Sequence, residues 1–202
     1  MSASVEASPP IELTAPKQAW KLGTVAIEDF LAMPETKPAS EFMRGRIYQK
    51  PMPQLQHSLL QVRIASKINQ LAEPQQTLFA FPELRCRFDE FVIVPDIAVL
   101  KWQNIPVQPD GKVANQVNLA PDWLIEILSP AQSSIQVMLK IMTAISLGSE
   151  LGWLVSPEEE TVMVFQGDRL PEIKTKSDRL AVLPNLEWQI SADELFGLLR
   201  LQ

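Results

Sequence analysis

The chain has 202 residues, of which 46% are hydrophobic and 21% charged, values that are ordinary for a globular protein of one domain. The single cysteine, Cys86, excludes an internal disulfide and a metal site built from thiolates. The first twenty residues lack an apolar core, and no run approaches the roughly eighteen apolar residues that a membrane span needs. We therefore expect a cytoplasmic protein with neither a signal peptide nor a membrane partner.

The net charge of −6 does not indicate a nucleic-acid-binding protein, but the charges are unevenly distributed. From Glu41 to Lys101, eight basic residues stand against six acidic ones, and after Lys101 thirteen acidic residues outnumber seven basic ones. A locally basic face within an acidic protein is one interpretation. Two ordinary solvated surfaces are the other, and the sequence leaves both open.

The N-terminal region, residues 1–23, contains prolines and little periodicity, which predicts an extended or partly disordered arm before one domain at 24–202. Thr24 is placed to cap a short helix that has Ile27 and Phe30 on one face.

The next segments predict a hairpin and a helix. Glu41–Lys50 has two strand-like pieces around Arg-Gly-Arg, typical of a β-hairpin. From His57 to Ala72 the apolar residues follow helical spacing, at Leu60, Ile64, Ile68 and Leu71.

Three strand-like runs and a second helix follow. Two β-rich runs cover Thr77–Phe88 and Phe91–Leu100. Pro121–Ser129 is almost wholly apolar except at its acids, which is typical of a strand covered on both faces. Gln132–Leu147 is predicted to be a helix that ends at the C-cap residue Gly148.

The C-terminal third predicts a hairpin from Leu151–Ser156 and Thr161–Gln166, then a short helix over Ser191–Leu199. Ser191 and Glu194 have the spacing of a capping box. The order of elements indicates an α/β fold of the mixed (α+β) type, with a central mixed β-sheet and helices on both sides.

Glu126 and Asp96 are the residues most indicative of function. Each is an isolated acid in an apolar strand, Glu126 within Trp123–Leu128 and Asp96 within Val92–Leu100. A buried carboxylate is unfavourable unless it is paired or ligates a metal. If the two strands are neighbours, both carboxylates can share a hard cation such as Mg²⁺ or Mn²⁺. A buried salt bridge or a raised pKa is the alternative explanation.

Three further residues are weaker candidates. Asp122 precedes Glu126 by an even number of residues, so both side chains can point to the same face of the strand. An acid after Pro121 is also a normal start for a strand, and we favour this structural explanation. Lys140, the one basic residue in its predicted helix, can reach back towards Glu126 or remain solvated. His57 can cap its helix, contact phosphate or have a structural role, and we favour the last.

Several motifs occur in the order typical of a known family. They are Asp96 after Val94-Pro95, the Glu126 strand ending in Leu128-Ser129-Pro130, Lys140 eight residues before Gly148, and Gly152-Trp153-Leu154-Val155. In this order they resemble the Uma-type restriction endonuclease family, within the PD-(D/E)XK nuclease superfamily. The stretch Glu41–Ser58 is also similar to it, which adds Glu41 and His57 as site candidates, and the resemblance covers about Glu41 to Phe165.

The resemblance implies a restriction-endonuclease-like core that hydrolyses DNA with Mg²⁺ or Mn²⁺. It makes Asp96 and Glu126 the metal-binding acids and Lys140 a lysine that has moved to the following helix. Nuclease folds of this kind often form homodimers, which suits the cutting of both DNA strands.

The sequence also departs from the family pattern. The usual lysine, two residues after Glu126, is Leu128, and three supporting polar residues are replaced by Ala131, Ala144 and Ser156. The resemblance therefore leaves open a catalytically weakened or inactive relative that binds DNA or a protein.

Overall fold

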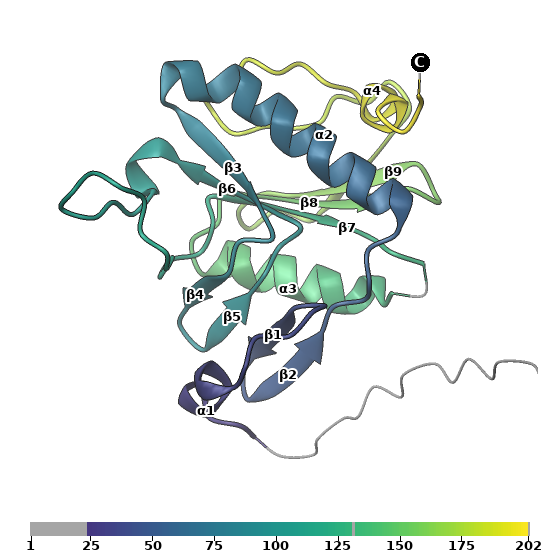
Figure 1. The fold of residues 1–202 in the computed structure, drawn as a ribbon. Helices are drawn as coiled ribbons and strands as arrows, with labels where there is room; N and C mark the ends of the chain where they lie inside the picture. The colour runs from purple at the N-terminus through teal and green to yellow at the C-terminus, as the bar shows by residue number, and fades with distance from the viewer. Residues whose placement is uncertain (1–23, 131, 202) are drawn as a thin grey trace, which may run out of the picture.

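A six-stranded mixed sheet forms the centre of the protein, seen here in a computed structural model that describes residues 24–130 and 132–201 (Figure 1). The strand order is β10-β9-β8-β7-β6-β3. β7 runs parallel to β8, and the other neighbouring strands pair antiparallel, as a mixed sheet requires. The arm expected over residues 1–23 lies outside the described residues. The strands are β3 (Leu78–Pro82), β6 (Ile97–Lys101), β7 (Trp123–Ile127), β8 (Leu151–Ser156), β9 (Thr161–Phe165) and β10 (Glu172–Thr175).

A second sheet has four strands in the order β2-β1-β5-β4. The hairpin predicted over Glu41–Lys50 is confirmed as its first two strands, and each of the two predicted β-rich runs contains two strands rather than one. Glu83 adopts a left-handed φ of 51°, and Pro95 lacks the N–H that a continuous ladder needs, so each run breaks. The two halves of each run then join different sheets. The strands of the small sheet are β1 (Ser40–Met43), β2 (Arg46–Gln49), β4 (Cys86–Phe88) and β5 (Phe91–Ile93).

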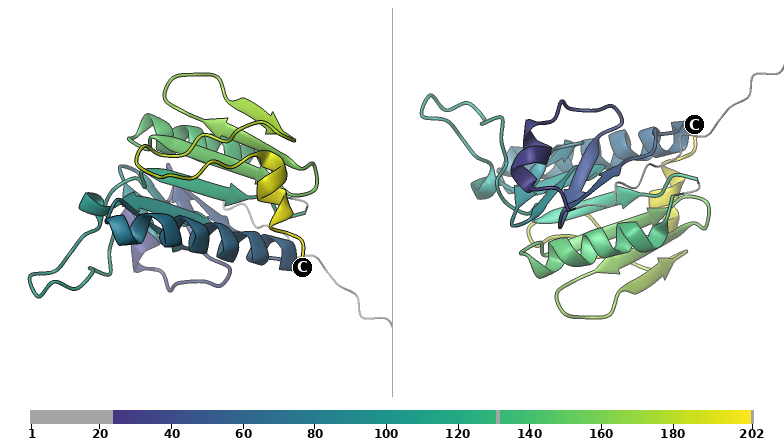
Figure 2. Two further views of the ribbon diagram at one scale, coloured as in Figure 1. Left: turned by 90° about the horizontal axis from the view of Figure 1, so that it is seen from above. Right: turned by 90° about the horizontal axis from the view of Figure 1, so that it is seen from below.

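Helices cover both faces of the large sheet, as the order of elements predicts (Figures 1 and 2). The long helix α2 and the C-terminal helix α4 lie on one face, and α3 lies on the other. None of the helices among the described residues is long and apolar enough to cross a membrane. The helices are α1 (Ile27–Ala32), α2 (Leu55–Ala72), α3 (Ser134–Ser146) and α4 (Ala192–Gly197).

Several helix ends follow local sequence signals, but the N-termini of α1 and α2 have no side-chain cap. The capping box of α4 is present, and Gly148 after α3 adopts a φ of 118°, which glycine tolerates best. The prediction that Thr24 caps α1 is wrong, because the N-cap residue is Ala26 and no side chain caps the helix. Burial of Ile27 and Phe30 against the small sheet stabilises α1 instead.

The strand β7 separates two apolar layers because successive side chains point to opposite faces of a sheet. Trp123 and Ile125 pack in the layer that contains α2, whereas Leu124 packs in the layer that contains α3. Glu126 has the parity of Leu124, so its side chain points towards α3. This alternation places the one acid within β7 on the side where Lys140 lies.

Candidate active site

Asp96 directly precedes β6, and Glu126 lies in the neighbouring strand β7. β6 pairs antiparallel with β7, with Ile97 opposite Ile125, so Asp96 and Glu126 are each adjacent in sequence to this pair. Lys50 Nζ lies 2.5 Å from Asp96 Oδ1 and 3.9 Å from Glu126 Oε2, so the two carboxyl groups are close to each other. Both residues are almost fully buried, with 2% and 1% of their surfaces exposed. The expectation that the two strands are neighbours is confirmed.

Asp96 is held by two side chains and a main-chain donor. Lys50 Nζ lies 2.5 Å from Asp96 Oδ1, and His57 Nε2 lies 3.0 Å from Oδ2. The N–H of Ile127 donates to the same Oδ2 at 2.7 Å. Burial alone would raise the pKa of Asp96, but Lys50 and the His57 hydrogen bond outweigh it and hold the pKa well below its usual range. The Asp96 carboxylate is therefore charged throughout the physiological pH range.

Glu126 shares the ammonium group of Lys140 with Glu41. Lys140 Nζ lies 2.9 Å from Glu126 Oε1 and 2.9 Å from each oxygen of Glu41. Glu41 Oε1 also accepts a hydrogen bond of 2.8 Å from the N–H of Val94. Burial raises the pKa of Glu126 to about 7, against the opposing effect of Lys140 and Lys50. The structure thus brings Glu41, Asp96, Glu126 and Lys140 into one buried cluster.

Both lysines remain charged in this cluster. Burial alone would lower the pKa of Lys50, but Glu126 and Asp96 raise it above its usual value. The pKa of Lys140 is likewise raised by Glu126 and Glu41, although burial opposes the rise. Three carboxylates and two ammonium groups therefore meet in a largely water-free region, where charge interactions are strong.

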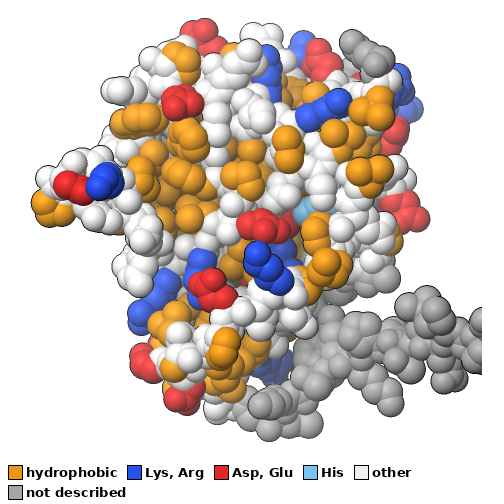
Figure 3. All heavy atoms as spheres, in the orientation of Figure 1, with side chains coloured by type: hydrophobic (Ala, Val, Ile, Leu, Met, Phe, Trp, Pro, Cys, Tyr) orange, Lys and Arg blue, Asp and Glu red, His pale blue; other side chains and the backbone are white. Residues whose placement is uncertain are grey.

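A cavity of about 380 Å³ opens onto the cluster. Lys50, His57 and Asp96 line it, and the basic side chains of Lys37 and Arg85 are also on its wall. On the face seen in Figure 3, described basic and acidic side chains are interspersed with hydrophobic ones rather than forming one basic surface. Of the buried acids of the cluster, Asp96 lines this cavity, whereas Glu41 and Glu126 lie behind its wall.

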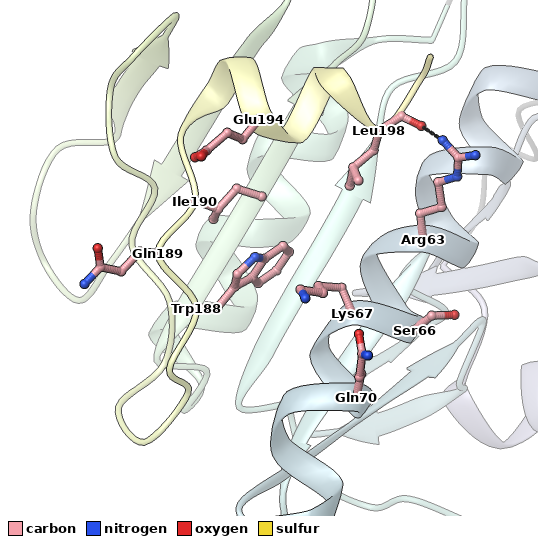
Figure 4. Close-up of a pocket in the computed structure, with 9 residues that line it drawn as sticks. All are labelled: Arg63, Ser66, Lys67, Gln70, Trp188, Gln189, Ile190, Glu194 and Leu198. Carbon is pink, nitrogen blue, oxygen red and sulfur yellow. Dashed lines mark hydrogen bonds between the residues drawn. The ribbon is translucent and has the colours of Figure 1, made fainter. Parts of the chain in front are cut away.

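A larger cavity of about 610 Å³ lies away from the acids, between α2 and the segment that leads into α4 (Figure 4). Among the described residues that line it, the only acid is Glu194, which belongs to the capping box of α4. Figure 4 shows Arg63 reaching the carbonyl oxygen of Leu198, so its guanidinium group already has a partner. This cavity has no pair of carboxylates and is not the chemical centre.

Comparison with known proteins identifies the family. The family model Uma2, "Putative restriction endonuclease", matches residues 27–193. The chain belongs to this family. A crystal structure of "a putative nuclease belonging to DUF820" from Anabaena variabilis is 41% identical and has a TM-score of 0.85, covering 87% of this chain and 99% of that chain. None of the curated proteins matches.

The structure shows what Leu128 contacts at the position of the usual lysine, and how Lys140 approaches Glu126. Leu128 packs with the apolar layer around α3 and donates its N–H to Val155 O at 2.8 Å, so nothing at this position replaces a lysine. Lys140 approaches Glu126 from α3 instead. The helix therefore supplies the ammonium group that the strand lacks.

Asp122 is not part of the cluster. It precedes β7 at the end away from Glu126, where its carboxylate accepts from the N–H of Lys101 and from Asn104 Nδ2. These bonds tie the start of β7 to the end of β6, in agreement with the structural explanation that we favoured.

His57 contacts Asp96 and does not cap its helix. α2 begins at Leu55 with Gln54 as its N-cap residue, so the capping explanation is wrong. The second ring nitrogen, Nδ1, is buried and has no hydrogen-bond partner among the described residues. His57 is therefore placed to orient Asp96 at the wall of the cavity.

Sequence reasoning missed two residues of the site, Lys50 and Gln61. Gln61 Nε2 donates to the main-chain oxygen of Asp96 at 2.8 Å. A signal for Gln61 exists, because it follows His57 by one helical turn on the buried face of α2. No comparable signal marks Lys50, which follows the last residue of β2 and reaches the acids only through the tertiary fold.

The donor atoms at the centre suit a hard divalent cation. Carboxylate and carbonyl oxygens are the ligands that Mg²⁺ and Mn²⁺ prefer, and oxygens of Asp96, Val94 and Glu126 converge on one ammonium nitrogen, that of Lys50. Within residues 24–130 and 132–201, no three acidic, histidine or cysteine side chains are arranged to hold a metal by themselves. The oxygens therefore fit a cation, and in this arrangement lysine provides the positive charge.

Proposed function

We propose that this Uma2-family protein is an endonuclease that hydrolyses phosphodiester bonds of DNA with the help of Mg²⁺ or Mn²⁺. One observation carries the proposal: Asp96 and Glu126 are buried close together, a lysine is paired with each, and Asp96 lines a cavity. Ionised side chains are rarely kept in such a position unless they are paired or hold a ligand.

Each residue of the cluster has a distinct part in this proposal. Asp96 and Glu126 would provide the oxygens that hold the cation. When bound, the cation would supply activation of a water molecule and stabilisation of charge on the phosphate. Lys140 positions Glu126 by its ion pair and neutralises Glu41. His57 and the N–H of Ile127 fix the orientation of the Asp96 carboxylate.

The DNA substrate and the homodimer are also parts of the proposal. Lys37 and Arg85 on the cavity wall would contact a phosphate backbone, although Glu35 and Glu83 line the same cavity and Arg85 is paired with Glu35. Two copies related by two-fold symmetry would present one centre to each strand of a duplex.

A nicking assay with matched variants tests the proposal. Purified protein is incubated with supercoiled plasmid and Mg²⁺ or Mn²⁺, and the conversion to open circles is measured. We expect nicking that chelator and Glu126→Gln abolish. Asp122→Asn is the matched control, because it removes an acid at the other end of β7 and should leave the rate per folded molecule unchanged.

An inactive DNA-binding relative is the second candidate. It is favoured by Leu128 and by the pairing of both site acids with lysines. Retention of DNA without cleavage in either metal, by a protein that remains folded, would support this function and contradict ours. Nicking that survives Glu126→Gln would show that the site is wrongly assigned.

A further inference from the structure

Lys50 Nζ is surrounded by oxygens from three different residues. It lies 2.5 Å from Asp96 Oδ1, 2.7 Å from the main-chain oxygen of Val94 and 3.9 Å from Glu126 Oε2. These are the same oxygens that fit a divalent cation. The side chain is 10% exposed, so little water shares the position.

The other oxygen of Glu126 is already assigned to a different lysine. Oε1 pairs with Lys140, which also holds Glu41 and therefore has a separate set of partners. Lys50 is near both Asp96 and Oε2 of Glu126, whereas Lys140 is paired with Oε1 of Glu126 and with Glu41. The two lysines are thus not equivalent, and only Lys50 lies between the two proposed metal ligands.

We propose that Lys50 acts as a built-in cation that competes with the divalent metal for the oxygens of Asp96 and Glu126. This inference rests on the proposed function, since it concerns the same acids. Two positive charges cannot occupy one position, so metal binding requires the ammonium group to leave. Lys50 also lines the cavity of about 380 Å³, which gives the displaced side chain room to move. There its charge would be available to a substrate phosphate.

Under this proposal, the apparent affinity for the metal depends on how strongly the Lys50 ammonium group holds the same oxygens. The metal binds only those molecules from which Lys50 has moved away, so its apparent Kd equals the intrinsic Kd divided by the fraction of such molecules. Removing the charge of Lys50 should therefore strengthen metal binding even if catalysis is damaged.

Titration calorimetry with Mn²⁺ in the absence of DNA tests this inference. We expect Lys50→Met to lower the Kd for Mn²⁺ by about tenfold or more, as loss of a competing state predicts. Lys112→Met is the control, because Lys112 is a highly exposed lysine in a loop, and its Kd should match that of the wild type. The gain should disappear when Asp96→Asn is added to Lys50→Met.

A measurement on the wild-type chain covers the case in which Lys50→Met fails to fold. Labelling by an amine-reactive reagent, followed by mass spectrometry, reports how accessible each lysine is. We expect Mn²⁺ to increase labelling of Lys50 severalfold and to leave Lys112 unchanged. Unchanged labelling of Lys50 at saturating Mn²⁺ would overturn the inference.

The outcomes separate this inference from the proposed function. Metal-dependent nicking by the wild type, together with equal or weaker Mn²⁺ binding by a folded Lys50→Met, overturns the role of Lys50 alone. Tighter binding by Lys50→Met without nicking by the wild type supports the role of Lys50 and contradicts the nuclease. No Mn²⁺ binding by either folded protein overturns both.

Discussion

Gly152 controls how closely α3 approaches the sheet, and Gly152→Ala should disturb both the fold and the site. A Cβ atom at this position would overlap with Cγ2 of Ile141 on α3, far inside normal contact distance. Ile141 is fully buried, and its branched side chain has little freedom to rotate away. The helix must therefore move, and it carries Lys140, the residue next to Ile141.

The magnitude follows from two opposing effects. Overpacking of a well-filled core typically costs about 1–3 kcal/mol. Replacing glycine by alanine also removes freedom from the unfolded chain, which stabilises the protein by about 0.4–1 kcal/mol. We expect a net loss of about 1–2 kcal/mol, because the contact involves a rigid buried methyl group. For a protein of this size, that loss lowers the Tm by about 2–8 °C.

Urea unfolding of Gly152→Ala, alone and combined with Ile141→Ala, measures the effect. Ile141→Ala removes the clashing methyl group, so the added Cβ should cost little in that background and the two changes should couple by about 1–3 kcal/mol. Gly197→Ala is the control, because no atom lies near its added Cβ. Equal losses for Gly152→Ala in both backgrounds would refute the reasoning. Unchanged stability of the single variant would refute it as well.

Three further predictions concern the acids and Lys140. Glu126→Gln should have a larger free energy of unfolding than the wild type at pH 8, measured with urea. Burial raises the pKa of Glu126 from 4.5 to about 7 in the folded protein, so the stability of the wild type decreases as the pH rises from 4.5 to 7. Glutamine does not ionise, so the variant should not show this decrease. A variant that is less stable at pH 8 would contradict this. Lys140→Met should lose about 3–5 kcal/mol, because Glu126 and Glu41 are left buried without their partner; a loss below about 1 kcal/mol would show that water replaces the ammonium group. Asp122→Asn should lose about 1 kcal/mol through its hydrogen bonds to Lys101 and Asn104, with unchanged Mn²⁺ affinity by calorimetry.

The parts of the fold that depend on local periodicity could be predicted from the sequence. The helix predicted over His57–Ala72 is confirmed because Leu60, Ile64 and Ile68 form one buried stripe. β7 was identifiable as a doubly covered strand because its residues are apolar on both faces. Isolated acids in such strands are informative, since burial makes them unfavourable without partners.

The parts that depend on long-range pairing could not be predicted in this way. The break at Pro95 leaves the apolar pattern unchanged on both sides, so periodicity does not reveal that β5 and β6 belong to different sheets. Lysine is usually exposed, and nothing near Lys50 marks it as buried. Its position depends on the pairing of β1 with β5, which joins segments about fifty residues apart.

The break between β5 and β6 explains why the hairpin carries two charged residues to the site. Val94 follows the last residue of β5 and is buried, so its main-chain N–H and C=O groups both need hydrogen-bond partners. Glu41 accepts from the N–H of Val94, and Lys50 donates to its oxygen. The same two side chains then reach Lys140 and Asp96, so the residues that satisfy the broken strand also complete the charged cluster. Asp96 therefore depends on Lys50, at the end of the hairpin, for its ammonium partner, whereas the nearest ammonium partner of Glu126, Lys140, comes from α3. A change that detaches the hairpin should remove the ammonium group from Asp96 while leaving the six strands paired.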